Sequence, residues 1–196
     1  MKNSILIGKD KWGPTAWNIY HSFSINFLKK YSDDYIIFIN TFGYVLPCET
    51  CKSHYNYVIN DIYKIDDTEI NKNNIIKYTY NIHKLVNELL NKKNISLKKA
   101  ILLNKDIHIN NSLFLIKTIY SNFDYKKMSF FLFDKIFNFF IVFCKLYPQK
   151  EIRKKLQKLI SSEKFNDINS PNQFFEWYKY NFLKLNIIKE SIHLNI

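Results

Sequence analysis

The sequence predicts an all-α protein, and three observations support this prediction. The chain has 196 residues, of which 47% are hydrophobic and 17% aromatic, which is enough to bury a substantial core. It contains only 3 glycines and 4 prolines, whereas an all-β fold requires many turns. Apolar residues also recur at three- and four-residue steps, the spacing of one face of a helix. We expect a four-helix bundle with a short fifth helix, followed by a second helical domain.

The first half of the chain carries five helical patterns. Pro14 suits the start of the first and Pro47 the start of the third, because proline is favoured in the first turn of a helix. The polar run 91–94 is typical of a helix end, and the polar residues 60–72 predict a loop. The expected helices cover residues 14–31, 34–45, 47–59, 73–91 and 95–103.

The second half begins after the polar connector 104–111. Its expected helices cover residues 112–122, 126–147, 149–163 and 171–188, with Pro148 and Pro171 between them. Because composition changes at the connector, we predict two domains, residues 1–104 and 105–196. The second domain has broad apolar helix faces and no motif that gives it a role.

The charge of the chain does not by itself indicate a nucleic-acid protein. The formal net charge is +12, but the lysines are scattered over the helices. Arg153 is the only arginine, so the side chain that most often reads base edges is nearly absent. We therefore expect solvated basic faces and no nucleic-acid partner.

The most apolar stretch, residues 128–147, predicts a buried helix. It contains Asp134 and Lys135, and its longest charge-free run is far shorter than the ~20 residues needed to cross a bilayer. Charged residues at 9–11 also interrupt the start of the chain, which argues against a signal peptide. We expect no membrane association. Cys144 lies in this stretch and is expected to be a buried, inert thiol.

Residues 47–54, Pro-Cys-Glu-Thr-Cys-Lys-Ser-His, are the most informative segment. Cys48 and Cys51 have the spacing of a disulfide in the first turn of a helix, where free N–H groups and the helix dipole stabilise a thiolate. His54 lies on the same face. The same side chains, with His83, also match the ligand types of a tetrahedral zinc site. A redox dithiol and a zinc-binding structural module both remain open at this point.

Two further pairs of residues point to a cofactor. Trp17 and His21 are one helical turn apart, as are His83 and Asn87. Each pair alone is more typical of a core. Together, aromatic faces with imidazole and amide donors favour a flat, polar, π-rich cofactor.

Three segments in order then resemble the Erv/ALR family of FAD-linked sulfhydryl oxidases. They are Trp12–His21, Leu46–His54 and His83–Lys92, and with the W-G-P opening they are most similar to the forms encoded by large DNA viruses. The similarity covers about residues 8–103. One departure is Lys84, which follows His83 where the family has asparagine.

The resemblance implies FAD as cofactor and a role for each matching residue. Cys48 receives the substrate thiolate, and Cys51 is the thiol next to the flavin. The residues that would bind FAD are Trp17 and His21 at the ring, His54 after the motif, His83 and Asn87 at the adenine and phosphates, and Lys92 near the pyrophosphate.

The resemblance also implies the reaction and its partners. Two thiols and molecular oxygen would give a disulfide and hydrogen peroxide. Because a second cysteine pair is missing, the expected substrate is a separate small dithiol or thioredoxin-like protein. We further expect a homodimer and no bound metal. The expected location is the host cytoplasm or the virion, with the mitochondrial intermembrane space as the alternative.

Overall fold

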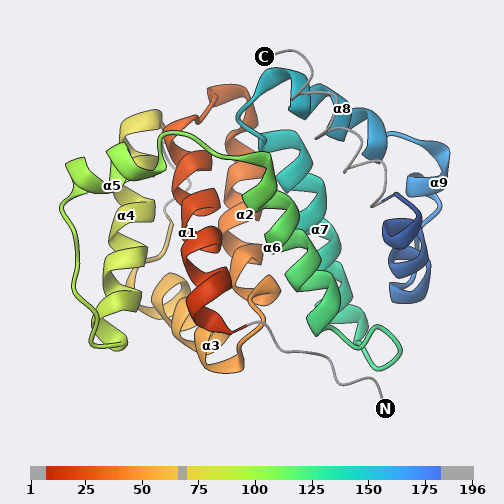
Figure 1. Ribbon diagram of the computed structural model, residues 1–196, viewed down its shortest axis with the longest axis horizontal. Helices are drawn as coiled ribbons and strands as arrows, with labels where there is room; N and C mark the ends of the chain where they lie inside the picture. The colour runs from red at the N-terminus through yellow and green to blue at the C-terminus, as the bar shows by residue number, and fades with distance from the viewer. Residues whose placement is uncertain (1–7, 66–69, 182–196) are drawn as a thin grey trace.

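The computed structural model describes residues 8–65 and 70–181, and every regular element within these ranges is helical (Figure 1). This confirms the predicted class. The helices of the first half are α1 (Lys9–Ile25), α2 (Ser32–Val45), α3 (Glu49–Tyr57), α4 (Lys72–Leu89) and α5 (Leu97–Asn104). A 3-10 turn, Lys29–Tyr31, precedes α2, and a π-helical turn, Val58–Ile62, extends α3.

The second half continues the helical pattern. Its helices are α6 (Ile109–Asn122), α7 (Phe130–Leu146), α8 (Lys150–Ile160) and the short α9 (Glu163–Asn166). Residues 171–181 are also helical, whereas residues 182–188 of the last predicted helix lie outside the described ranges. The predicted helix 149–163 is therefore divided, since α8 ends at Ile160 and a separate turn forms α9.

The first predicted helix is wrong at both ends. The observed helix α1 begins at Lys9, contains Pro14, and ends at Ile25 instead of residue 31. A proline is favoured in the first turn of a helix, which is why the start was expected at Pro14. Trp12 is only 5% exposed, and burial of its ring stabilises an additional helical turn before that proline. The predicted loop 60–72 likewise begins with a π-helical turn, in which Val58 and Ile59 are buried.

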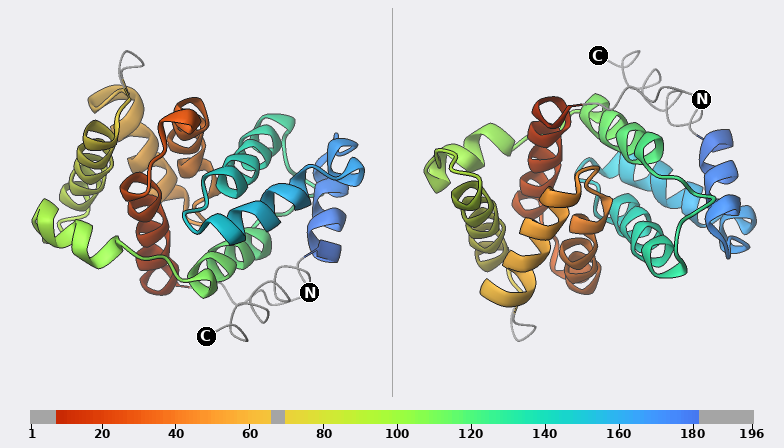
Figure 2. Two further views of the ribbon diagram at one scale, coloured as in Figure 1. Left: turned by 90° about the horizontal axis from the view of Figure 1, so that it is seen from above. Right: turned by 90° about the horizontal axis from the view of Figure 1, so that it is seen from below.

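Helices α1 and α2 occupy the centre of the molecule, with α4 and α5 on one side and α6 and α7 on the other (Figures 1 and 2). The most extensive helix pair is α2 with α7. In it the rings of Phe38 and Phe139 stack at 5.7 Å, and Lys145 Nζ lies 2.8 Å from Asp34 Oδ1. The second half of the chain thus supports α2, the helix that leads into the Cys48–Cys51 turn.

Helix α7 is the most apolar helix of the described chain and one face of it is buried, as predicted for residues 128–147. Its buried residues include Phe133, Ile136, Phe139, Phe140, Phe143 and Cys144. Over residues 8–65 and 70–181, none of the helices combines the length and the hydrophobicity that crossing a membrane requires.

Candidate active site

Cys48 and Cys51 form a disulfide at the start of α3, with their Cα atoms 5.1 Å apart. Leu46 is extended, as expected for a residue before proline, so Leu46–Pro47 ends α2 and starts the next turn. Cys48 is the N-cap of α3, and its Sγ accepts a hydrogen bond of 3.2 Å from the Cys51 backbone N–H. This cap and the positive end of the helix stabilise a thiolate at Cys48 when the disulfide opens.

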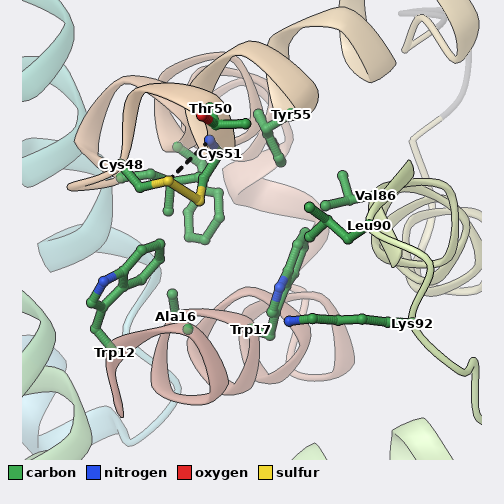
Figure 3. A pocket seen from close by; sticks show the side chains of 13 residues that line it. Trp12, Ala16, Trp17, Cys48, Thr50, Cys51, Tyr55, Val86, Leu90 and Lys92 are labelled. Atoms are coloured by element: carbon green, nitrogen blue, oxygen red, sulfur yellow. Dashed lines mark hydrogen bonds between the residues drawn. A yellow bond between two sulfur atoms is a disulfide. The ribbon is translucent and has the colours of Figure 1, made fainter. Parts of the chain in front are cut away.

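The disulfide faces a cavity of about 170 Å³ between α1, α3 and α4 (Figure 3). Trp12 and Trp17 line it from α1, and Lys92 reaches toward Trp17 from the turn after α4 (Figure 3). The remaining lining residues are Gly13, Ala16, Phe42, Leu46, Thr50, Tyr55, Val86 and Leu90. In Figure 3 the Cys51 sulfur points toward the middle of the cavity, whereas Cys48 lies on its outer side near Trp12.

Behind Trp17 lies a pair of histidines. The Trp17 and His83 rings stack at 3.9 Å with 8° between their planes, and His83 Nδ1 is 2.8 Å from His21 Nε2. Burial lowers the pKa of His21 to about 4. Burial, together with His21 and Lys92, lowers the pKa of His83 to about 3. Both rings are therefore neutral at neutral pH, and one donates to the other while fixing the indole.

The position of Lys92 follows from the way α4 ends. Asn91 has a φ of 52°, and the Lys92 backbone N–H donates to the Asn87 carbonyl at 2.8 Å. The Asn91 N–H donates to the Glu88 carbonyl at 3.1 Å, which completes a Schellman motif. The chain reverses there and directs Lys92 to the cavity. The Asn87 side chain binds Asn94 at 3.2 Å instead of lining the cavity.

His54 is one turn beyond Cys51 on α3 and does not line the cavity. Its Nδ1 is buried, and the described part of the chain offers that nitrogen no hydrogen-bond partner. Lys84, which replaces the expected asparagine, is exposed and pairs with Glu88 at 3.8 Å. Of these two residues, His54 therefore retains an unused polar atom that a bound group could satisfy.

The structure brings part of the predicted site together. Trp17, Cys48, Cys51 and Lys92 line one cavity, and His21 and His83 support it from behind. His54 and Asn87 are placed elsewhere. Trp12, Val86 and Leu90 also line the cavity but were not predicted as site residues. Trp12 stood in the W-G-P string, but Val86 and Leu90 carry no signal that distinguishes a cavity wall from a core.

The residues present fit a flavin. Aromatic walls beside a dithiol suit an apolar ring, and a lysine at the edge suits a phosphate. A tetrahedral zinc site, the alternative interpretation of these residues, needs four ligands. Residues 8–65 and 70–181 contain no group of three or more His, Cys, Asp or Glu side chains placed to share a metal ion.

Comparison with known proteins points to a family. The model of the Erv1/Alr family matches residues 14–106, which include the disulfide, both histidines and Lys92. Residues 14–106 of this chain therefore match the Erv1/Alr family. The family segment spans all but the first turn of α1, continues through α5 and stops before α6.

Two viral proteins that are similar to this chain carry the name FAD-linked sulfhydryl oxidase. The protein of Acanthamoeba polyphaga mimivirus is 29% identical over 96 residues, which cover 47% of this chain and 67% of the relative. That of Frog virus 3 (isolate Goorha) is 37% identical over 57 residues, which cover 29% of this chain and 36% of the relative. No solved structure matches the chain significantly.

Proposed function

We propose that this protein is a FAD-linked sulfhydryl oxidase of the Erv1/Alr family that converts two thiols and molecular oxygen into a disulfide and hydrogen peroxide. The observation that carries the proposal is the Cys48–Cys51 disulfide facing a cavity walled by Trp12 and Trp17, with Lys92 at its edge. Bound FAD would accept two electrons from the reduced dithiol and pass them to oxygen.

The cysteines have different tasks. A substrate thiolate attacks Cys48 Sγ, which forms a mixed disulfide and releases Cys51 as a thiolate on the cavity side. The second substrate thiol loses its proton and attacks the substrate sulfur of that bond, so the substrate disulfide forms and Cys48 leaves as a thiolate. The Cys51 N–H that caps Cys48 Sγ stabilises this leaving group. The placement of Cys51 toward the cavity supports its assignment as the flavin-side thiol.

The other residues would hold the cofactor. Trp17 supplies an aromatic wall, and the neutral His21–His83 pair keeps its indole in one orientation. Lys92 would offset phosphate charge, and the buried His54 nitrogen would gain a partner. The Asn87 side chain fixes the Lys92 turn through Asn94, so we assign it a positioning role.

Composition and stoichiometry of the purified protein test this function. We expect a yellow protein with one flavin per chain that oxidises dithiothreitol and releases one hydrogen peroxide for each disulfide formed. A colourless protein that holds stoichiometric zinc and oxidises no dithiol would contradict the proposal and support the zinc-binding structural module.

We further propose a domain organisation, a location, a substrate class and an oligomeric state. Residues 1–104 would form the oxidase domain, with four helices and the short α5 around FAD, and residues 105–196 a second helical unit. The similarity to proteins of large DNA viruses supports a place in the host cytoplasm or virion. A small dithiol protein would be the substrate. Sedimentation equilibrium of the full chain tests the expected homodimer.

A further inference from the structure

Two adjacent aromatic side chains at the start of α7 are left in solvent. Phe130 is 72% exposed and Phe131 is 58% exposed. Single exposed apolar residues are common on protein surfaces, but neighbouring large ones are typical of an interaction site. The Ser129 side chain caps the helix at this point by accepting the Leu132 N–H, so the two rings stand on a fixed helical turn.

These rings lie beside the redox turn. The Phe131 ring contacts Tyr44 at 5.6 Å, edge to face, and Tyr44 comes four residues before Cys48. On the other side, Phe123 lies under Lys52 Nζ at 5.1 Å, and the Lys52 backbone N–H donates to the Cys48 carbonyl at 2.9 Å. The segment 123–131 therefore contacts the chain within four residues of Cys48 on both sides.

We propose that the segment 123–131, with Phe130 and Phe131 as anchors, docks the apolar flank of a reduced protein dithiol that attacks Cys48. The proposal rests on the proposed function and names how its substrate is recognised. Any such substrate must bring a sulfur to Cys48, and the segment 123–131 contacts Tyr44 and Lys52, which lie on either side of that cysteine in the chain. Covering the two rings would remove apolar surface from water, whereas a small dithiol does not extend far enough to cover them.

The charges around the patch define the partner further. Lys52 is only 14% exposed and is held by Phe123 and by Glu49 at 2.6 Å. Lys135 Nζ lies 5.3 Å from the Phe131 ring, and its own neighbour Asp134 is at 3.9 Å. The exposed loop before α7 carries two basic residues, Lys126 and Lys127, and one acidic residue, Asp124. Basic side chains therefore outnumber acidic ones around the patch, as they do in the whole chain, whose formal net charge is +12. We assign the partner an apolar flank bordered by acidic residues.

Two synthetic peptides and dithiothreitol test the assignment. Both peptides carry Cys-Gly-Gly-Cys, one flanked by leucines and glutamates and the other by serines and lysines. We expect wild-type kcat/KM to favour the first peptide by about tenfold, which corresponds to about 1.4 kcal/mol. The variant Phe130→Ser/Phe131→Ser should lose that preference through a raised KM, while oxidation of dithiothreitol stays unchanged.

The matched control is Leu102→Ser/Leu103→Ser on α5. These leucines are 74% and 60% exposed but belong to the opposite side of the molecule (Figure 1). This control should keep the preference for the apolar, acidic peptide. Equal loss in both variants would contradict the assignment, as would a preference that survives in the Phe130/Phe131 variant.

The outcomes also separate this inference from the proposed function. If wild type oxidises dithiothreitol but does not discriminate between the peptides, the docking surface is wrong and the oxidase remains. If wild type oxidises neither, the proposed function fails first. A change from dimer to monomer in the Phe130/Phe131 variant with unchanged peptide kinetics would assign the patch to a second copy of the chain and overturn the proposal.

Discussion

Both halves of this protein are rich in aromatic residues, but the rings fill a core in the second half and line a cavity in the first. In the second half, the rings of Phe140, Phe174 and Trp177 pack against one another, and the cavity that Phe140 and Phe174 line measures only about 20 Å³. In the first half, Trp12 and Trp17 stand apart around a cavity of about 170 Å³ that the disulfide faces. The aromatic content of a segment therefore does not indicate a binding site.

What distinguishes the two regions is the polar groups next to the rings. The second half places Cys144 at 0% exposure, and burial raises the pKa of its thiol far above the ordinary value. The first half places Cys48 at a helix N-terminus, with a backbone N–H on its sulfur. Cys144 in the packed region is therefore inert, whereas the N-terminus of α3 stabilises the thiolate form of Cys48.

The largest contrast between the two regions should come from their cysteines. Cys48→Ser and Cys51→Ser should each lower dithiothreitol oxidation by at least about a thousandfold, because each removes one sulfur of the only disulfide in the described chain. Cys144→Ala should leave the rate within about twofold. Oxygen consumption measures all three, and full activity in Cys51→Ser would overturn the assigned roles.

A pair of ring deletions separates packing from binding. Phe140→Ala should lower the free energy of unfolding by about 3–5 kcal/mol, since it empties a filled core, and leave the flavin content of the folded fraction unchanged. Trp17 is only partly buried and lines the cavity, so for Trp17→Ala we expect a smaller loss of stability and a clear loss of bound flavin. Urea unfolding and flavin absorbance measure the two effects. Equal flavin loss in both variants would contradict the contrast.

The histidine pair predicts acid sensitivity of the first half. The folded-state pKa values of His21 and His83, about 4 and about 3, lie below the ordinary value of 6.5. Between these values the unfolded chain binds protons that the folded chain does not. Stability is therefore retained above pH 6.5 and falls as the pH falls toward 4, by up to about 1.4 kcal/mol per pH unit for each histidine.

The matching variant is His21→Gln, which should flatten the dependence of the unfolding free energy on pH between 6.5 and 4. The exposed His108 provides the control, and His108→Gln should keep the slope of wild type. Urea midpoints at pH 7, 6 and 5 measure the slopes. An unchanged slope in His21→Gln would show that this ring is not buried in its neutral form.

The smallest effect is expected at the edge of the cavity. Lys92→Gln should weaken FAD binding severalfold, mostly at low salt, because the lysine is exposed and its attraction for phosphate is screened. Lys93→Gln is the matched control, since Lys93 is the next residue but does not line the cavity. Fluorescence titration of flavin-depleted protein measures both. Equal weakening would assign the effect to net charge alone.

The helices could be predicted because their apolar spacing is local, but their ends could not. Pro14 is a local start signal, and the buried Trp12 ring outweighs it through contacts that the sequence does not display. The connector 104–111 indicated a boundary. It did not indicate that α7 would pack along α2 through Phe38 and Phe139.

The site could be predicted where a motif fixes the geometry. Cys48 and Cys51 share one helical turn, but their spacing fits either a disulfide or a metal site. The family strings pointed to the disulfide, and they also named Trp17 and Lys92, which line the same cavity. Val86 and Leu90 could not be found, because apolar residues at helical spacing look the same beside a cavity and in a core.

The central claim is that electrons leave the Cys48–Cys51 dithiol for a flavin in the cavity. Anaerobic titration of the purified protein with dithiothreitol tests it most directly. We expect the visible flavin absorbance of wild type to disappear at about one equivalent, and that of Cys51→Ser, with its FAD still bound, to persist. Reduction of the flavin in Cys51→Ser at the wild-type rate would contradict the claim.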